Sequence, residues 1–190
     1  IVLACMVVCL GVHVPTAAYA AQALRVAVAE LRNEDGGVKP TELAYLTDQI
    51  RSQAASVLPA ERFLVMTRES IVALLPPNVK LSDCAKGQCE VEIGRTIGAD
   101  YIVTGEVLSL DEEFRLNLKV HHCGSGAFLG GQRLRGQRIG QLEAALDTAC
   151  AELFGLVMEH AGLKPKRVAV EGGVRGDDLI VLADQVVVRD

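Results

Sequence analysis

Residues 84–108 read CAKGQCEVEIGRTIGADYIVTGEVL, and this stretch decides the fold. Its middle predicts a short helix over 90–97, because apolar residues recur on one helical face and acidic residues favour the N-terminal end. Gly98 then stands where a helix ends in a residue that tolerates positive φ. The run Ile102-Val103-Thr104 is β-branched, which is typical of a buried strand. The stretch therefore predicts a loop, a short helix, a tight turn and a buried strand.

The rest of the chain supplies further elements on both sides of this stretch. Strands are expected at 24–31, 63–66, 114–120 and 127–134, and helices at 41–58, 68–75 and 139–158. Strand 114–120 alternates apolar and polar residues, so one of its faces is buried. Helix 41–58 is amphipathic, and Arg51 is expected on its exposed side. The pattern predicts a single α/β domain, with a central mixed sheet of about four to five strands and amphipathic helices packed on it.

The first twenty residues differ in composition from the rest of the chain. Residues 1–14 are almost entirely apolar, and Ala18-Tyr19-Ala20 ends this segment in the small-x-small pattern of a signal peptidase site. The apolar run is too short to span a membrane. We therefore expect a signal peptide at 1–20, a domain at 21–162 and an appended β-prone tail at 163–190. The mature protein is expected to be periplasmic or secreted.

A second interpretation of the N-terminal segment is a lipobox at Val2-Leu3-Ala4-Cys5. Cys5 would then carry a lipid, and membrane contact is expected only in that case.

The composition of the chain disfavours nucleic acid as a partner. The net charge is −5 and only 4% of residues are aromatic. Nucleic-acid binding needs a basic face and usually stacking aromatic side chains, so no nucleic-acid partner is expected.

The chain has six cysteines, and cleavage after residue 20 would remove Cys5 and Cys9. The mature chain would keep Cys84, Cys89, Cys123 and Cys150. An even set of cysteines in an exported protein favours disulfides. We expect Cys84 to pair with Cys89 and Cys123 with Cys150, although the sequence alone does not choose among the possible pairings.

Two other uses of these cysteines compete with disulfides. A zinc site needs four converging ligands. However, adjacent His121 and His122 point to opposite faces of a strand, so at most one of them can join. Catalytic dithiols use a C-x-x-C spacing at a helix N-terminus. Cys89 has the position but the wrong spacing, and its acidic neighbours oppose a thiolate. Structural disulfides are therefore preferred to metal and to redox chemistry.

Two further patterns resemble catalytic or binding motifs. The glycines between Gly124 and Gly130 resemble a dinucleotide loop, but such a loop must open a helix, and a strand is expected here. Ser125 and His122 are the pair that most nearly resembles the Ser-His arrangement of a hydrolase. The simpler interpretation is that Ser125 is an ordinary turn residue. No catalytic residue, metal ligand or cofactor is therefore expected.

The C-x4-C-E-V-E-I-G-R-T-I-G-A-D-Y-I-V-T-G-E segment at 84–106 resembles the central signature of CsgG/TolB-N-like envelope domains. This group includes LpoB-like and FlgT/FlgO-like domains, and the match is to the form found in secreted myxobacterial proteins. Strands at 26–30 and 62–68 stand where such domains have their first two strands, and the resemblance covers about 24–157. The resemblance implies an α/β fold and a non-catalytic role, and it assigns no catalytic or binding role to any residue of this chain.

The sequence predicts a non-catalytic periplasmic or cell-envelope module that binds envelope proteins or cell-wall components. Two alternatives stay open. One is an exported thiol-redox or metal-binding protein built on the four cysteines. The other is the ligand-sensing domain of a larger regulatory protein.

Overall fold

The computed structural model describes residues 22–33, 37–77 and 88–164. The expected signal peptide at 1–20, the tail from residue 165 onward, and Cys84 lie outside the described residues. Within the described part, the chain folds as the sequence predicts, into a mixed sheet with helices packed against it.

The sheet has six described strands in the order β3-β1-β4-β5-β6, with the short β2 pairing to β4. The strands are β1 (Leu24–Val28), β2 (Arg32–Asn33), β3 (Phe63–Val65), β4 (Tyr101–Leu110), β5 (Glu113–His122) and β6 (Phe128–Gly136). β1 runs parallel to β3 and β4, whereas β4, β5 and β6 are antiparallel. The predicted mixed sheet is thus confirmed. Its extra strand, β2, is two residues long, which is too short to leave a pattern in the sequence.

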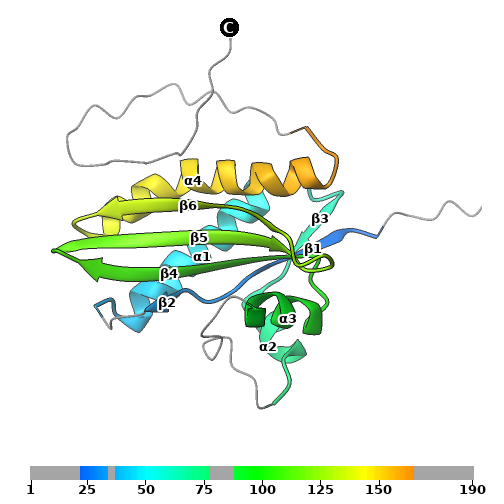
Figure 1. The fold of residues 1–190 in the computed structure, drawn as a ribbon, viewed down its shortest axis with the longest axis horizontal. Coiled ribbons are helices and arrows are strands. Elements are labelled where there is room, and N and C mark those ends of the chain that lie inside the picture. Colours follow the sequence, from blue (N-terminus) through cyan, green and yellow to red (C-terminus); the bar gives the residue numbers. More distant parts are fainter. Residues whose placement is uncertain (1–21, 34–36, 78–87, 165–190) are drawn as a thin grey trace, which may run out of the picture.

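The helices divide unequally between the two faces of the sheet (Figure 1). α1 (Pro40–Val57) and α4 (Ile139–His160) pack against each other and share the main core with one face. α2 (Arg68–Leu74) and α3 (Gln88–Thr96) lie on the other face and share a smaller cluster with one end of it. This second cluster, the minor core, contains Ala27, Met66, Ile71, Ile93, Ile97, Ala99, Ile102 and Cys123.

The helix-turn-strand predicted for the central stretch is present as α3 followed by β4. Gly98 has φ +69°, and the N–H of Ala99 donates to the carbonyl of Gly94 at 2.8 Å, so the helix ends as expected. A Cβ at Gly94 would collide with Sγ of Cys123. α3 can therefore approach the sheet this closely only because Gly94 lacks a side chain.

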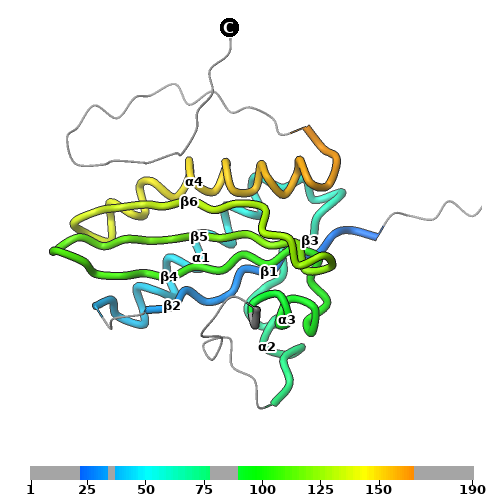
Figure 2. Tube along the Cα trace, viewed as in Figure 1, coloured from blue at the N-terminus to red at the C-terminus, as the bar shows by residue number. Residues whose placement is uncertain are grey.

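The strands after α3 form a continuous antiparallel meander, which Figure 2 traces from β4 through β6. Asp111 and Glu112 connect β4 to β5 with φ of 51° and 63°, the left-handed backbone that a two-residue hairpin turn requires. The predicted alternation of β5 is confirmed, because Leu116, Leu118 and Val120 are fully buried in the main core.

Arg51 is a correction to the sequence prediction. The helical pattern of 41–58 predicts it on the exposed side, but it is buried under the end of β1. Its guanidinium donates to the carbonyl of Val28 at 2.9 Å and pairs with Glu30 and Asp48 at 2.7 Å. Long side chains at the margin of an apolar stripe can bury their stems in this way.

None of the helices in the described part is both long enough and apolar enough to cross a membrane.

The first prediction tests the main core. Leu118→Ala and Leu146→Ala remove side chains that are each 1% exposed, so each should lower the free energy of unfolding by about 2–5 kcal/mol. Lys119→Ala, on the opposite side of the same strand, should change it by no more than about 0.5 kcal/mol. Urea unfolding midpoints measure all three. A larger loss for Lys119→Ala than for Leu118→Ala would contradict the register of β5.

Candidate functional site

In the part of the chain that the structure describes, the sheet face opposite α1 and α4 is only partly covered. α2 and α3 occupy one end of it (Figure 1). At the other end, β4, β5 and β6 present side chains that are all exposed or half-buried. We call this surface the open face, and it consists of Glu106, Leu108, Leu110, Glu113, Arg115, Asn117, Lys119, His121, Phe128, Arg133 and Arg135.

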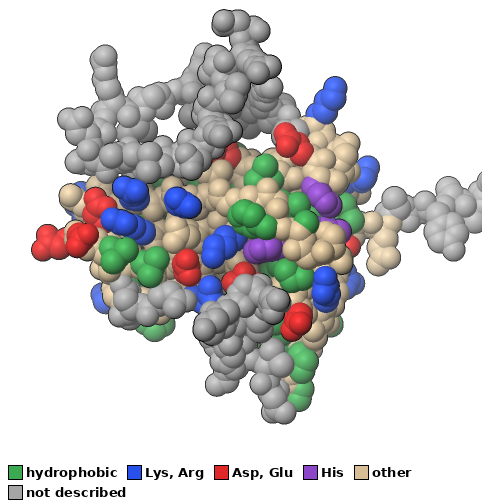
Figure 3. All heavy atoms as spheres, in the orientation of Figure 1, with side chains coloured by type: hydrophobic (Ala, Val, Ile, Leu, Met, Phe, Trp, Pro, Cys, Tyr) green, Lys and Arg blue, Asp and Glu red, His purple; other side chains and the backbone are tan. Residues whose placement is uncertain are grey.

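The middle of the open face is basic. Strand pairing sets Arg115 directly opposite Arg135, and Asn117 opposite Arg133. Lys119, two residues after Asn117 on β5, lies on the same face. Figure 3 looks onto this face and shows Lys and Arg side chains gathered over β4 to β6. Four positive side chains thus gather on one face of a chain whose net charge is −5.

Carboxylates neutralise only part of this charge. Arg115 lies 3.9 Å from Glu113, and Lys119 lies 3.9 Å from Glu106. Within the described residues, neither Arg133 nor Arg135 has an ion-pair partner. Like charges set directly opposite each other on neighbouring strands are destabilising. The facing arginines therefore cost stability unless an anion joins them.

Exposed apolar side chains flank the basic region. Phe128 is 60% exposed at one end, and Leu110 is 44% exposed at the other. The ring of Phe128 packs on His121 with centroids 5.3 Å apart. Nδ1 of His121 is buried and has no hydrogen-bond partner in the described part of the chain. The open face thus combines a basic centre with apolar margins.

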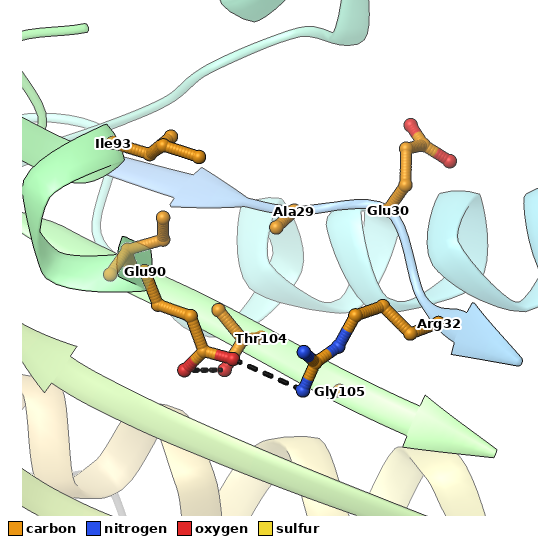
Figure 4. A pocket seen from close by; sticks show the side chains of 8 residues that line it. Ala29, Glu30, Arg32, Glu90, Ile93, Thr104 and Gly105 are labelled. Atoms are coloured by element: carbon orange, nitrogen blue, oxygen red, sulfur yellow. Dashed lines mark hydrogen bonds and ion pairs between the residues drawn. The ribbon is translucent and has the colours of Figure 1, made fainter. Parts of the chain in front are cut away.

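A small hollow with both apolar and charged lining residues lies where α3 meets the open face (Figure 4). Its accessible volume is about 10 Å³, which is room for about one water molecule. Its lining comes from the β1–β2 connection, β2, α3 and β4, namely Ala29, Glu30, Arg32, Glu90, Ile93, Ile102, Thr104 and Gly105.

Glu90 is the central side chain of this hollow and is only 5% exposed. The hydroxyl of Thr104 donates to its Oε2 at 3.0 Å, and Arg32 lies 3.3 Å from its Oε1 (Figure 4). Arg32 also lies 3.5 Å from Glu106 on the open face. With both carboxylate oxygens occupied, Glu90 serves as a tie between α3, β2 and β4. The sequence identified Glu90 only as a favourable first-turn residue, because its partners are distant in the chain.

The cysteine prediction needs correction where the structure describes it. Cys123 and Cys150 are both buried and free, so the expected bridge between them is not formed. Cys123 belongs to the minor core and Cys150 to the main core, on opposite sides of the sheet. The physical reason is strand parity, which places Cys123 on the α3 side. Cys84 lies outside the described residues, and the side chain of Cys89 is not among those described.

Neither described thiol is suited to redox or metal chemistry. Burial, with a smaller contribution from Asp100, raises the pKa of Cys123 to about 11. Burial, with a smaller contribution from Asp147, raises the pKa of Cys150 to about 12. Both thiols are therefore protonated near neutral pH, whereas nucleophiles and metal ligands are thiolates. In the described part of the chain, no three His, Cys, Asp or Glu side chains converge to hold a metal ion.

The Ser125–His122 contact closes a turn. Oγ of Ser125 lies 2.8 Å from Nδ1 of His122, and the N–H of Ser125 donates to the same nitrogen at 3.2 Å. The ring of His122 stacks near that of His160, with centroids 4.6 Å apart, and His160 contacts the hydroxyl of Tyr101. Burial, followed by the charge of His160, lowers the pKa of His122. The glycines after Ser125 lead into β6, a strand, as the sequence predicts.

Comparison with known proteins finds likeness to solved structures only. No protein-family model matches the chain, and no curated protein matches it. The LpoB C-terminal domain from Salmonella enterica is 16% identical, with a TM-score of 0.47 over 60% of this chain and 83% of that one. TolB from Acinetobacter baumannii is 16% identical, with a TM-score of 0.45 over 73% of this chain and 29% of that one.

A lipoprotein from Neisseria meningitidis is 13% identical, with a TM-score of 0.46 over 65% of this chain and 94% of that one. TolB and LpoB are two of the domain types that the sequence signature resembles. Identities and TM-scores this low carry no argument about function. The CsgG, flagellar and myxobacterial parts of the resemblance stay predictions.

The second prediction concerns Glu90. Glu90→Gln keeps the shape of the side chain but removes the charge that faces Arg32, so the free energy of unfolding should fall by about 1–3 kcal/mol. Glu106→Gln is the matched control. Its more exposed ion pairs should contribute less than about 1 kcal/mol. Urea unfolding measures both, and equal losses would contradict the role of Glu90 as the tie of α3.

The third prediction concerns the buried thiols. In the native protein, iodoacetamide should leave Cys123 and Cys150 unmodified near neutral pH, and unfolding should make both reactive. Both folded pKa values lie above the ordinary 9.0, so the stability these thiols contribute is present below pH 9.0 and is lost as the pH rises toward 11 to 12. Mass spectrometry of labelled peptides locates each thiol. A Cys123–Cys150 disulfide peptide would contradict the structure.

Proposed function

We propose that this chain is a non-catalytic module of the cell envelope that binds a protein partner through the open face. The observation that carries the proposal is the combination of a basic centre with the exposed margins formed by Phe128 and Leu110. Arginine and aromatic side chains are enriched at protein interfaces, whereas ordinary surface carries mixed charge. The signal peptide expected at 1–20 and the envelope-domain signature at 84–106 support an envelope location.

The two alternative functions have weaker support. A thiol-redox or metal-binding role built on four cysteines would need reactive thiolates, but two of the four are buried and protonated near neutral pH. A ligand-sensing role would need a cavity for the ligand. In the described part of the chain, the hollow beside Glu90 offers room for about one water molecule, so this hollow gives such a role no support.

The fourth prediction tests the proposal in intact cells. A photo-crosslinking amino acid in place of Phe128, on the open face, should give a discrete crosslinked product in the envelope fraction. Leu64 is the matched control, because it is 52% exposed on β3 at the opposite edge of the sheet. The same substitution there should give no such product.

N-terminal sequencing of the protein from the same fraction tests export, with Ala21 as the expected first residue. Equal crosslinking from both positions, or recovery of the protein in the cytoplasm with residues 1–20 intact, would overturn the proposed function.

A further inference from the structure

We infer that the open face binds an extended, acidic segment of a protein, with carboxylates at alternate positions opposite Arg133 and Arg135. This inference rests on the proposed function and adds the chemistry of the partner. It follows from the spacing of the arginines, from their incomplete neutralisation and from the apolar margins of the face.

The spacing of the arginines matches an extended peptide. Arg133 and Arg135 are two residues apart on β6, so both side chains project from the same face. Alternate residues of any extended chain are about 7 Å apart. A segment lying along β6 can therefore place one acidic side chain near each arginine. A guanidinium forms short, often bidentate, hydrogen bonds with a carboxylate.

The charge of the face needs an anion from outside the described chain. Arg115 and Arg135 face each other across β5 and β6, and among the described residues the one carboxylate within ion-pair distance of either is that of Glu113, 3.9 Å from Arg115. Nε of Arg115 is buried with no hydrogen-bond partner in the described part of the chain. A carboxylate above the pair would offset the repulsion.

The surroundings of the arginines favour a polypeptide over other polyanions. Phe128 and the leucines at the other end of the face offer apolar contacts, which the alternate residues or flanks of a peptide can use. The exposed aromatic surface on the face is confined to Phe128 and the His121 ring packed on it. A single-stranded nucleic acid would need several stacking rings along its path. The acidic hairpin residues Asp111 and Glu112 lie between β4 and β5, so the positive region does not extend to that end and suits a short acidic segment better than a long polyanion.

The fifth prediction measures binding of a defined probe to the full mature chain. The probe is a fluorescent peptide of alternating glutamate and threonine, and its anisotropy is followed at low salt. A peptide with glutamine in place of glutamate is the neutral control. We expect the glutamate peptide to bind and the glutamine peptide to bind at least about tenfold more weakly, because hydrogen bonds to charged groups are the stronger ones.

Arg133→Glu and Arg135→Glu should each weaken binding of the glutamate peptide by about tenfold. Arg62→Glu is the charge-matched control, because Arg62 is exposed next to β3 at the far edge of the sheet, and binding should be unchanged. Urea midpoints close to that of the unmodified protein confirm that each variant is folded. Equal weakening by all three variants would overturn the inference, since binding would then depend only on net charge.

Two further outcomes separate this inference from the proposed function. In one outcome, dextran sulfate binds more tightly than the peptide, and the same two substitutions weaken its binding. That result would assign the face to a sulfated or similar polysaccharide and would overturn the inference of an acidic protein segment. Crosslinking from Phe128 that persists in the Arg133→Glu/Arg135→Glu double variant would also overturn it, while leaving the proposed function intact. If the crosslink is lost in the double variant but kept in Arg62→Glu, the result supports both the inference and the proposed function.

Discussion

The close seating of α3 on one end of the sheet is the constraint on which the open face depends. Packing of Ile93 and Ile97 in the minor core, and a hydrogen bond from Arg95 to the carbonyl of Cys123 at 2.6 Å, hold the helix there, and two further features act with them. Gly94 lets its backbone approach Cys123, and Glu90 joins it to Thr104 and Arg32. Because α3 is short, it covers only the end of the sheet nearest Ile102, and the other residues that the structure describes leave the rest of that face exposed or half-buried. α3 therefore supplies part of the minor core, and its short length sets how far that core extends along the sheet.

The two faces of the sheet differ in what they contribute. On one, α1 and α4 bury the apolar side chains of β4 and β5 in the main core, which is the larger of the two clusters of buried apolar residues. On the other, stability contributed by the minor core is offset in part by arginines that face each other across β5 and β6. A surface that retains such repulsion while carrying exposed apolar side chains is better suited to binding than to stability.

The two described thiols and the Ser125–His122 pair belong to the structural scaffold. Cys123 and Cys150 behave as small apolar residues that fill the two cores, and the raised pKa of each thiol follows from that burial. The Ser125–His122 pair closes the turn before β6 and so helps position the strand that carries Arg133 and Arg135. Side chains that resemble catalytic groups in the sequence thus support the scaffold.

Local sequence by itself determined all elements except the two-residue β2, and most of their buried faces. The helix, the positive-φ glycine and the β-branched strand of 84–108 follow from spacing of a few residues, and so does the alternation of β5, because helix and strand periods act over short distances. Tertiary structure alone decided the rest. Burial of Arg51, separation of Cys123 from Cys150, the partners of Glu90 and the gathering of basic side chains on the open face all depend on strand order and on which face each helix covers. Those are long-range pairings, and net charge or local periodicity carries no record of them.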